Sequence, residues 1–422
     1  MKPVVLVTAY AVNPFRGSED GTGWNIIRHL ARRHRIVAVT RRNNRESIDQ
    51  YFEMHPAPAD QRPEFLYFDL PYWLSFWKKG GRGALLYHYL WHLGVVFFIL
   101  RRRLHFDLAH HLNFHSDWTP SFLWLLGKPF VWGPVGHHAA IPAPFIRKYG
   151  AKAWLLDRLR WWTKQWFWTF DPFLKITKWK AAGVIGVNSS VQQVLRVPGH
   201  RFSVIPAIAS EPPQRQGSAP ARLQVLSIGR FVPLKGFDIT IRAFAACYHR
   251  QAEVVQDEMC LTLIGKGPEK QRLQAIAREC RLPATAIRFV DWLNRHELAL
   301  YFEASRVFFF PSHEGAGMVI PEALSYGIPV LCFDNFGPGE LCDDSCAIRI
   351  PYTPTYAESI DRFSVALERL LTDDALHSRL AARAVVRFEQ HFNWERKAER
   401  IGSIYHQALK AGIEEDARPQ YL

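Results

Sequence analysis

The apolar positions of this chain form short, β-branched runs separated by longer stretches with helical spacing. Alternation of this kind is typical of parallel sheets covered by helices. In the first half we expect strands at residues 4–9, 35–40, 107–112, 129–135, 183–188 and 203–206. In the second half we expect them at residues 223–230, 259–265, 286–291, 306–311 and 328–333. The pattern therefore predicts an α/β protein with two doubly wound, Rossmann-like domains.

A stretch rich in Pro, Gln and Ser separates the two series of strands. Residues 206–222 are interpreted as a linker, which places a first domain at 1–205 and a second at 223–388, followed by a C-terminal segment at 389–422. Ligands of such sheets bind at the carboxyl ends of the strands, and two such domains create a cleft. Functional residues are therefore expected immediately after strands.

Charge and tryptophan are divided unevenly along the chain. Residues 1–210 hold 28 Lys and Arg against 12 Asp and Glu, whereas residues 211–422 hold 25 against 27. Of the 15 tryptophans, 13 precede residue 211. A basic, Trp-rich half favours contact with an anionic membrane surface or an anionic polymer. A solvated basic surface with buried aromatic residues accounts for the same composition equally well.

The cysteines and the apolar segments indicate the compartment of the protein and whether it spans a membrane. All six cysteines lie in the second half without paired spacing, which fits reduced, buried thiols of a cytoplasmic protein and predicts no metal site. The first apolar stretch is too short for a signal peptide and predicts a buried strand. Residues 85–103 are short for a membrane span and include His88 and His92, so we expect a core or interfacial helix.

Two loops of the second half carry candidate phosphate-binding features. In the first, Gly229 allows a tight turn, and Arg230 and Lys235 place two cations where they could neutralise a diphosphate. In the second, Gly265 and Gly267 follow a strand and precede a helix, which is consistent with the wall of a nucleotide pocket. Each loop alone is equally consistent with an ordinary solvated turn.

The stretch PSHEGAGMVIPEALSYGIPV, residues 311–330, is more informative. A strand ends here, Glu314, Gly315 and Gly317 lie in a glycine-rich loop, and a helix with Gly327 as its cap carries Glu322. We expect the N–H groups of this loop to bind an anion beside Glu314, and Glu322 to bind two adjacent hydroxyls such as those of a ribose. A capping role for Glu314 and an exposed helix charge at Glu322 would be the structural alternative.

These residues together resemble a known family. The chain resembles glycosyltransferase family 4, which comprises retaining enzymes of the two-domain GT-B fold. The resemblance covers residues 227–238, 261–268, 314–330 and 391–405. The first half resembles a narrower group of these enzymes, many linked to bacterial surface polysaccharides, at residues 16–41, 107–114 and 129–138. The resemblance implies that the second domain binds a nucleotide-sugar and that the C-terminal helix crosses back to the first, acceptor-binding domain.

The resemblance also implies roles for the donor-binding residues. Arg230 and Lys235 would hold the diphosphate, Glu322 the ribose, and Glu314 the hydroxyls or the developing positive charge of the transferred sugar. A phosphate leaving group stabilised by two cations and backbone N–H groups needs no metal ion and no cofactor. Retention of configuration is an implication of the family, with the acceptor proton passing to the departing phosphate.

In the first domain, the residues that match functional positions of the family are glycines and histidines. Gly21 and Gly23 match a glycine loop that approaches the diphosphate and the acceptor, although the usual Gly-Gly pair here is Gly-Thr-Gly. The family's catalytic histidine could correspond to His110, His111 or His115, and we select His111. Two further histidines, where the family commonly has Gly-Gly, are candidates for acceptor contacts: His137 and His138.

Two segments, 71–83 and 149–180, carry most of the interleaved tryptophan and basic residues. They suit the headgroup region of a bilayer and favour a cytoplasmic protein bound peripherally to the inner face of the cell membrane, whereas packing of the rings on their own domain is the structural alternative. A basic nucleic-acid-binding protein and another Rossmann-type nucleotide-binding enzyme are the alternatives for function. The favoured hypothesis is transfer of a sugar to a lipid-linked glycan in exopolysaccharide, O-antigen or capsule biosynthesis, with no nucleic-acid partner.

Overall fold

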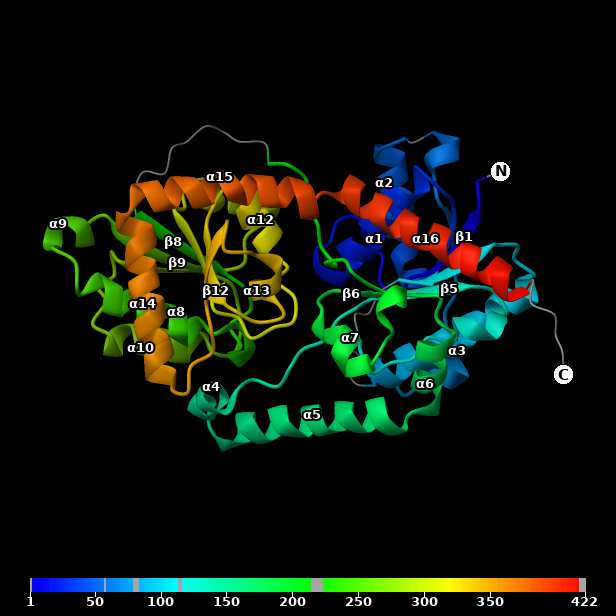
Figure 1. Cartoon of the computed structure of the whole chain (residues 1–422), viewed down its shortest axis with the longest axis horizontal. Helices are drawn as coiled ribbons and strands as arrows, with labels where there is room; N and C mark the ends of the chain where they lie inside the picture. The colour runs from blue at the N-terminus through cyan, green and yellow to red at the C-terminus, as the bar shows by residue number, and fades with distance from the viewer. Residues whose placement is uncertain (1, 57, 79–82, 113–115, 214–222, 417–422) are drawn as a thin grey trace. The chain divides into compact units, whose positions relative to one another are not determined.

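The chain forms two compact units, each built on one parallel sheet (Figure 1). The computed structural model describes residues 2–56, 58–78, 83–112, 116–213 and 223–416. The first unit comprises Met1–His137, Trp162–Ile208 and Trp394–Leu422, and the second comprises His138–Trp161 and Ala209–Asn393. The prediction of two doubly wound α/β domains is therefore confirmed.

The division into units differs from the expected domain boundaries in one respect. Residues 138–161, expected within the first domain, group with the second unit. Residues 394–422 group with the first unit, so the chain passes four times between units at positions that the structure describes. Residues 214–222 of the expected linker lie outside the described part of the chain.

The sheet of the first unit has seven parallel strands in the order β3-β2-β1-β4-β5-β6-β7. Buried β-branched residues form its centre, where Thr8 lies opposite Val39 on one side and His111 on the other. The edge strand β3 was not expected from the sequence, because it begins with a glutamate and is only partly buried. The strands are β1 (Val4–Thr8), β2 (Arg35–Thr40), β3 (Glu64–Tyr67), β4 (Leu108–His111), β5 (Phe130–Val135), β6 (Gly183–Gly186) and β7 (Phe202–Val204).

Helices cover both faces of this sheet. The C-terminal helix packs against α1 and contacts β4, β5 and β6, whereas α3 buries Trp91, Val95 and Ile99 against Val37 and Val39. By length and composition alone α3 could cross a membrane, and 39% of its apolar window is buried within the unit. The principal helices are α1 (Ser18–Ala31), α2 (Arg45–Met54), α3 (Ala84–Arg102), α6 (Pro172–Lys180), α7 (Ser190–Leu195) and α16 (Trp394–Asp416).

The second unit has six parallel strands in the order β10-β9-β8-β11-β12-β13. The alternation of strand side chains divides its core: Val307 and Phe309 of β11 join the cluster under α8 and α14, and Phe308 and Phe310 join the opposite cluster with α12. Strand β13 was not expected, since Arg349 interrupts its apolar pattern. The strands are β8 (Leu223–Ile228), β9 (Met259–Ile264), β10 (Ile287–Val290), β11 (Val307–Phe310), β12 (Val330–Phe333) and β13 (Ala347–Ile350).

Local signals set the ends of the helices in this unit. Asn294 and Glu297 form a reciprocal capping box at the start of α11, and Gly327 adopts a left-handed conformation (φ 72°) just after α12, as expected for a helix cap. The helices are α4 (Ala143–Ile146), α8 (Phe237–Tyr248), α9 (Glu253–Gln256), α10 (Lys270–Glu279), α11 (Arg295–Glu303), α12 (Ile320–Ser325), α13 (Pro338–Leu341), α14 (Tyr356–Thr372) and α15 (Asp374–His391). Helix α5 (Ala151–Phe170) begins in the second unit and ends in the first.

The first unit contains buried histidines that titrate abnormally. His88 and His92 lie on α3 with their Nε2 atoms 3.0 Å apart, and the His92 ring stacks on that of His111. Burial lowers the pKa of His88 and of His92 well below the usual value, with the charge of His111 as a smaller cause. Burial also lowers the pKa of His110 to about 4. These rings are therefore neutral in the folded unit near neutral pH.

We expect the first unit to lose stability as the pH falls below about 6.5. The three histidines with lowered pKa values bind protons more readily in the unfolded chain than in the fold, so protonation favours unfolding. Each contributes a slope of up to about 1.4 kcal/mol per pH unit between its unfolded and its folded pKa. Urea unfolding followed by tryptophan fluorescence at about pH 7.5, 6.5 and 5.5 would measure this slope.

The matched variants are His92→Phe and His200→Phe. The first removes one buried titrating ring and should flatten the pH dependence, whereas the second changes an exposed ring and should leave it unchanged. A His92→Phe protein with the wild-type slope would contradict this explanation.

Candidate active site

The strand order of the second unit reverses between β8 and β11. In a doubly wound sheet this switch point is where loops diverge and ligands bind at the carboxyl ends of the strands. The loop after β8 carries Gly229, Arg230 and Lys235, and the loop after β11 carries Glu314. The topology therefore brings Lys235 and Glu314 together from two loops, although they lie 79 positions apart in the sequence.

Lys235 and Glu314 form a buried ion pair at this point. The Lys235 Nζ atom lies 2.8 Å from Oε1 and 2.7 Å from Oε2 of Glu314. The two side chains are 13% and 9% exposed, and the ammonium also lies 4.8 Å from the centre of the Phe310 ring. A charge-assisted contact to both oxygens fixes the carboxylate, and the limited exposure shields the pair from screening by salt.

Backbone contacts hold the two loops against each other. The His313 N–H donates to the Leu234 carbonyl at 2.8 Å, and the Ser312 hydroxyl donates to the same oxygen at 3.2 Å. Gly236 has a left-handed conformation (φ 68°), and a Cβ atom there would lie 2.3 Å from the Pro311 carbonyl oxygen. Only glycine permits this approach, so the loop carrying Lys235 is tied directly to the loop carrying Glu314.

The loop after β9 packs equally closely on the loop after β8. A Cβ atom at Gly265 would lie 1.9 Å from the Gly229 carbonyl oxygen, and one at Gly267 would lie 2.3 Å from the Phe231 carbonyl oxygen. The Phe231 N–H donates to the Lys266 carbonyl at 2.9 Å. Gly265 and Gly267 therefore serve close backbone packing in the structure, and this packing holds the loops where a phosphate could approach their main chain.

The turn after β12 also supports the Glu314 loop. A Cβ atom at Gly337 would lie 1.9 Å from the Glu314 carbonyl oxygen, so this turn packs directly on the loop. The Asn335 amide donates to the Ser312 carbonyl at 2.9 Å, and its oxygen accepts from the N–H groups of Gly337 and Gly339. The side chain of Asn335 therefore joins the turn to the Glu314 loop.

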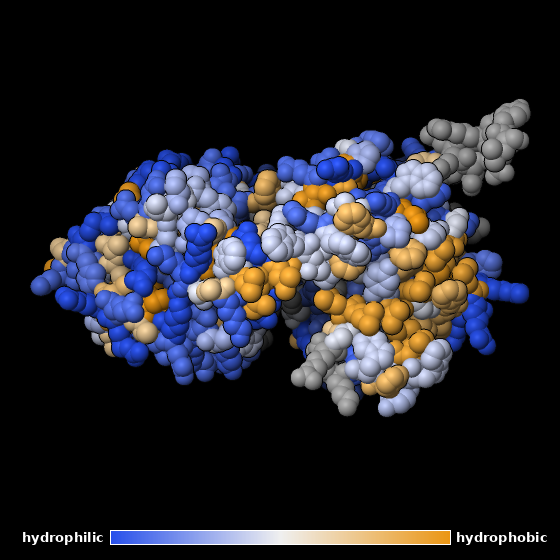
Figure 2. All heavy atoms as spheres, turned by 90° about the horizontal axis from the view of Figure 1, so that it is seen from below, coloured by the Kyte–Doolittle hydropathy of each residue, from blue (hydrophilic) through white to orange (hydrophobic). Residues whose placement is uncertain are grey.

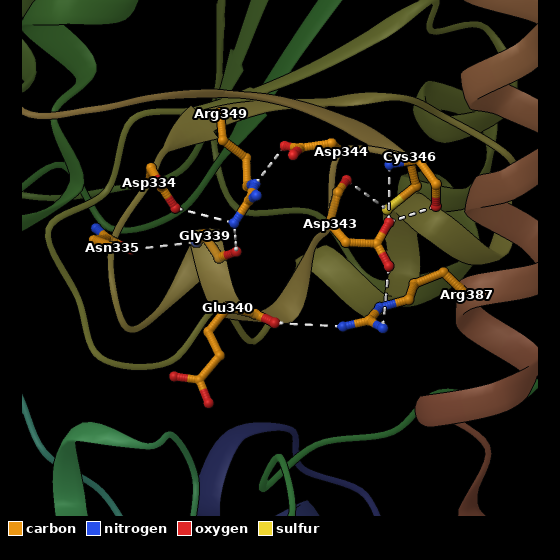
Figure 3. Close-up of polar contacts among 10 residues, drawn as sticks. Asp334, Asn335, Gly339, Glu340, Asp343, Asp344, Cys346, Arg349 and Arg387 are labelled. Carbon is orange, nitrogen blue, oxygen red and sulfur yellow. Dashed lines mark hydrogen bonds and ion pairs between the residues drawn. The ribbon is translucent and has the colours of Figure 1, made fainter.

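Charged contacts brace this turn in its place (Figure 3). The Arg349 guanidinium contacts Asp334 at 3.0 Å and Asp344 at 2.8 Å and donates to the Gly339 carbonyl at 3.2 Å. Beside it, Arg387 of α15 contacts Asp343 at 3.3 Å. The contacts connect the turn to β13 and to α15, so the support of the Glu314 loop extends through the unit.

The other residues of this unit that were expected at the site differ in their burial and in their contacts. Arg230 is exposed at the end of β8, and Glu322 is half-buried in α12. Gly315 is buried, and its N–H donates to the His138 Nδ1 atom at 2.9 Å. The expectation that the loop's N–H groups bind an anion must be corrected for Gly315, whose N–H is engaged by an imidazole. Helix α12 begins only at Ile320.

His313, within the same loop, is fully enclosed by aromatic rings. Its ring stacks on those of Phe333 and Tyr352, and its Nδ1 atom lies 2.9 Å from the Tyr352 hydroxyl oxygen. Burial lowers the pKa of His313 to about 3, so the ring is neutral near neutral pH. The sequence analysis did not assign a role to His313, and its place between Ser312 and Glu314 was the only available signal.

In the first unit, the expected glycine loop is a helix. Gly21 and Gly23 lie in the first turns of α1 and are buried. A Cβ atom at Gly21 would lie 2.4 Å from the Arg16 carbonyl oxygen, so the close approach of the preceding loop accounts for glycine there. The expectation of a loop at these positions was therefore wrong: α1 begins at Ser18, and glycine at position 21 makes room for the Arg16 carbonyl.

The histidines at the end of β4 belong to the core of the first unit. His110 is completely buried, with its Nδ1 atom 2.5 Å from the Tyr405 hydroxyl oxygen and its Nε2 atom 2.7 Å from the Gly133 carbonyl oxygen. His111 is 4% exposed and lines a small cavity together with His88, Ser116 and Thr119. Burial of His110 argues against direct contact with an acceptor. His115 lies outside the described residues.

His137 and His138 are adjacent in sequence but belong to different units. The His137 Nδ1 atom lies 2.6 Å from the Asp117 carboxylate, whose other oxygen is 3.4 Å from the Lys164 Nζ atom. Sequence reasoning missed Asp117 and Lys164, because neither belongs to a motif and the pairing is evident only in three dimensions. His138, by contrast, is exposed and lies in the second unit at the Glu314 loop.

No group of three or more His, Cys, Asp or Glu side chains within the described residues is arranged to hold a metal ion. All six cysteines are free thiols, five of them buried and Cys280 half-buried.

Comparison with known proteins agrees with this geometry. Residues 210–386 match the family described as "Glycosyl transferases group 1". The second unit contains a group 1 glycosyltransferase domain. The matched range includes the switch point and both members of the Lys235–Glu314 pair.

Several curated relatives match part of the chain. A protein of Acidothermus cellulolyticus named D-inositol 3-phosphate glycosyltransferase is 30% identical over 193 residues, which is 44% of this chain and 41% of that protein. An Escherichia coli protein named O-antigen chain mannosyltransferase B is 30% identical over 110 residues, 26% of this chain and 27% of that protein. The chain thus matches less than half the length of these relatives.

Solved structures extend the likeness to the whole fold. HepE of Anabaena, solved in complex with UDP and glucose, aligns with a TM-score of 0.60 over 96% of this chain and 99% of its own, at 16% sequence identity. At that identity the likeness establishes the fold alone: two parallel-sheet α/β domains of the GT-B type.

We expect removal of one member of the Lys235–Glu314 pair to destabilise the second unit. Lys235→Met leaves the carboxylate buried without its counter-charge, which costs about 3 kcal/mol, whereas Lys235→Met combined with Glu314→Gln should cost less than the sum of the single changes. Urea unfolding of the single and double variants measures the coupling.

The control is the exposed pair of Lys270 and Asp291, which lie 2.7 Å apart. Lys270→Met should cost less than about 1 kcal/mol because solvent screens this pair. Equal effects of Lys235→Met and Lys270→Met would show that burial does not strengthen the Lys235–Glu314 contact.

Proposed function

We propose that this protein is a retaining glycosyltransferase that moves a sugar, a hexose in our proposal, from a nucleotide-sugar donor to a lipid-linked glycan during surface-polysaccharide biosynthesis. The observation that carries the proposal is the buried Lys235–Glu314 pair at the switch point of a group 1 glycosyltransferase domain. Arg230 is exposed at the same edge of the sheet. Opposite charges of this kind suit a substrate that joins a diphosphate to a sugar.

The order of the strands supports one orientation of the donor. Along the edge, the glycine loop after β9 is followed by Arg230 and Lys235 after β8, and then by Glu314 after β11. Adjacent strands lie about 4.8 Å apart, so these loops span roughly 10 Å, which is comparable to a diphosphate with its attached sugar. The cations would hold the diphosphate, and Glu314 would bind hydroxyls of the transferred sugar or its developing positive charge.

Charge compensation explains why Lys235 lies between the two groups. A diphosphate placed beside Glu314 would repel the carboxylate, and the ammonium reduces this repulsion because it contacts both carboxylate oxygens. In the transition state, negative charge grows on the departing phosphate and positive charge grows on the sugar. Lys235 would stabilise the first and Glu314 the second, so the pair suits the transition state better than the ground state.

The transfer step uses no cofactor and no metal ion in this proposal. The acceptor hydroxyl oxygen forms a bond to the anomeric carbon while the bond from that carbon to the phosphate oxygen breaks on the same face. The hydroxyl proton passes to the departing phosphate oxygen, and a nucleoside diphosphate leaves. Glu322 would hold the ribose, since its half-buried position on α12 follows the Glu314 loop.

The first unit would bind the acceptor. His137 is only 3% exposed and so is nearly as buried as His110, but its ring is oriented by the Asp117 carboxylate, whereas His110 is engaged in the core at both ring nitrogens. His111 remains a candidate because it lines a cavity with Ser116 and Thr119. The name of the Escherichia coli relative, O-antigen chain mannosyltransferase B, supports a polysaccharide product, whereas the inositol phosphate named for other relatives would be a soluble acceptor.

An exposed aromatic stripe favours the lipid-linked acceptor over the soluble one. Five large apolar side chains line one side of α5 at helical spacing, each more than half exposed: Leu155, Leu159, Trp162, Trp166 and Phe170. None of the twenty residues of α5, all of which the structure describes, is fully buried. Figure 2 shows hydrophobic residues gathered on the corresponding face of the first unit. Apolar surface of this extent is typical of an interaction site.

Further exposed aromatic rings lie outside α5, and one of them has a cation beside it. Trp179 of α6 is 69% exposed with Lys180 over its ring, and Tyr72, Trp73 and Phe76 are exposed in the segment before α3. Trp154 and Trp168 instead pack partly against the cores of the units, so only some rings of residues 149–180 face solvent. Exposed rings beside cations suit the headgroup region of an anionic bilayer, and we propose peripheral binding to the inner face of the cell membrane and no nucleic-acid partner.

We expect Lys235→Ala and Glu314→Ala to reduce sugar transfer by at least about 1,000-fold, because each removes charge stabilisation from the transition state. Calorimetric titration against a panel of nucleoside diphosphates and nucleotide sugars identifies the donor, and NMR of the product's anomeric proton tests retention. Addition of EDTA should leave the rate unchanged. Full activity of either variant would refute the assigned roles.

We expect the protein to sediment with vesicles containing anionic lipid and to be released by salt. Trp162→Ser combined with Trp166→Ser should weaken binding about tenfold or more, since each ring loses its place at the interface. Trp292→Ser, which changes an equally exposed tryptophan of the second unit, is the matched control and should bind normally. Equal sedimentation of all three proteins would contradict a membrane role for α5.

A further inference from the structure

Residues 138–161 belong to the second unit, although the sequence on either side of them belongs to the first. The first part of this segment, residues 138–150, docks on the second unit, and we call it the arm. Phe145 anchors the arm. Its ring is 1% exposed, belongs to the main core of the second unit, and lies within 5.1 to 6.0 Å of the rings of His313, Phe333, Tyr352 and Tyr356. The arm therefore packs against the same aromatic cluster that encloses the residue preceding Glu314.

A buried carboxylate fixes the other end of the arm. Asp238, 1% exposed, accepts hydrogen bonds from the Tyr149 hydroxyl at 2.5 Å and from the Tyr356 hydroxyl at 2.7 Å. Burial and then the Asp238 charge raise the pKa of Tyr149, so its hydroxyl remains a donor. Arg272 lies 4.1 Å from the Tyr149 ring centre and donates to the Lys148 carbonyl. These contacts make the arm an integral part of the second unit.

The arm delivers His138 to the Glu314 loop. The His138 Nδ1 atom accepts a 2.9 Å hydrogen bond from the Gly315 N–H, across 177 positions of sequence. An accepting Nδ1 atom defines the neutral tautomer that carries its proton on Nε2. The N–H of Gly315 and the carbonyl of Glu314 belong to one peptide group, so His138 holds one edge of a rigid plane.

The opposite edge of that plane is held as well. Gly337 approaches the Glu314 carbonyl so closely that a Cβ atom would lie 1.9 Å from its oxygen. The peptide plane that follows Glu314 is thus clamped between an imidazole and a glycine backbone, while Lys235 holds the carboxylate of the same residue. Three contacts from three different segments determine where this carboxylate lies.

We propose that His138 is a positioning residue for Glu314, acting through the Gly315 peptide rather than as one of the acceptor contacts with which the sequence had grouped it. The inference rests on the proposed function for its kinetic consequence, because Glu314 is there assigned to the transition state. Loss of the clamp lets the Glu314–Gly315 peptide rotate, and a misplaced carboxylate stabilises the transition state less. Donor binding depends mainly on Arg230 and Lys235 and is retained.

The test compares His138→Ala, His138→Asn and the control His200→Ala, which removes an exposed histidine of the first unit. An asparagine amide oxygen lies close to the place of Nδ1 and can accept from the Gly315 N–H. We expect His138→Ala to lower kcat about tenfold with the donor KM changed less than about twofold. His138→Asn should recover kcat to within about threefold of the wild type, and His200→Ala should equal the wild type.

Amide hydrogen exchange at Gly315 provides a readout that does not depend on transfer. Exchange should be faster in His138→Ala and restored towards the wild-type rate in His138→Asn. Wild-type kcat and exchange in His138→Ala, or equal losses in the alanine and asparagine variants, would overturn the inference. If the wild-type protein transferred no sugar from any donor, the proposed function would fail, while the exchange experiment would still decide whether His138 clamps the loop.

Discussion

The buried ion pair between Lys235 and Glu314 is the contact on which the arrangement of the second unit's site depends. Removing two charges from water is costly, and their attraction compensates for this cost only when the geometry is held closely. Both carboxylate oxygens lie within 2.8 Å of the Lys235 Nζ atom. A functional pair of this kind therefore requires rigid support on each side, and the rest of the unit supplies it.

That support consists largely of backbone packed on backbone. Gly236 lies against Pro311, Gly265 against Gly229, and Gly337 against Glu314, each at a distance that a Cβ atom would not permit. Side chains then join these loops to more distant elements, as Asn335 does for the Glu314 loop and Arg349 for the turn beside it. The glycines that the sequence suggests as phosphate-binding residues are therefore required first for packing, and any closeness to a phosphate follows from that packing.

Local patterns in the sequence were sufficient for the central strands of both sheets and for the strand-end positions of Lys235 and Glu314. Strand ends carry Arg230, Lys235 and Glu314, and the parallel topology brings such ends to one edge whatever the intervening sequence. The edge strands β3 and β13 were not predicted because charged residues break their apolar pattern. The glycine pair at Gly21 and Gly23 was expected in a loop, since a glycine-rich motif does not reveal whether a preceding carbonyl or a ligand requires the missing side chain.

Contacts distant in sequence were beyond prediction, and the histidines illustrate why. His110, His111, His137 and His138 are alike in a sequence, yet the first is engaged in the core by Tyr405 and Gly133, and the last lies exposed at Gly315 in the other unit. Their roles depend on the partner each ring meets, and those partners lie 19 to 295 positions away. The same holds for the arm, residues 138–150, which the sequence places in the first domain although its Phe145 packs into the core of the second unit and its Tyr149 binds the buried Asp238. One continuous stretch of chain thus carries both the arm, which reaches the Glu314 loop through His138, and the exposed apolar stripe of α5 that we propose for contact with lipid.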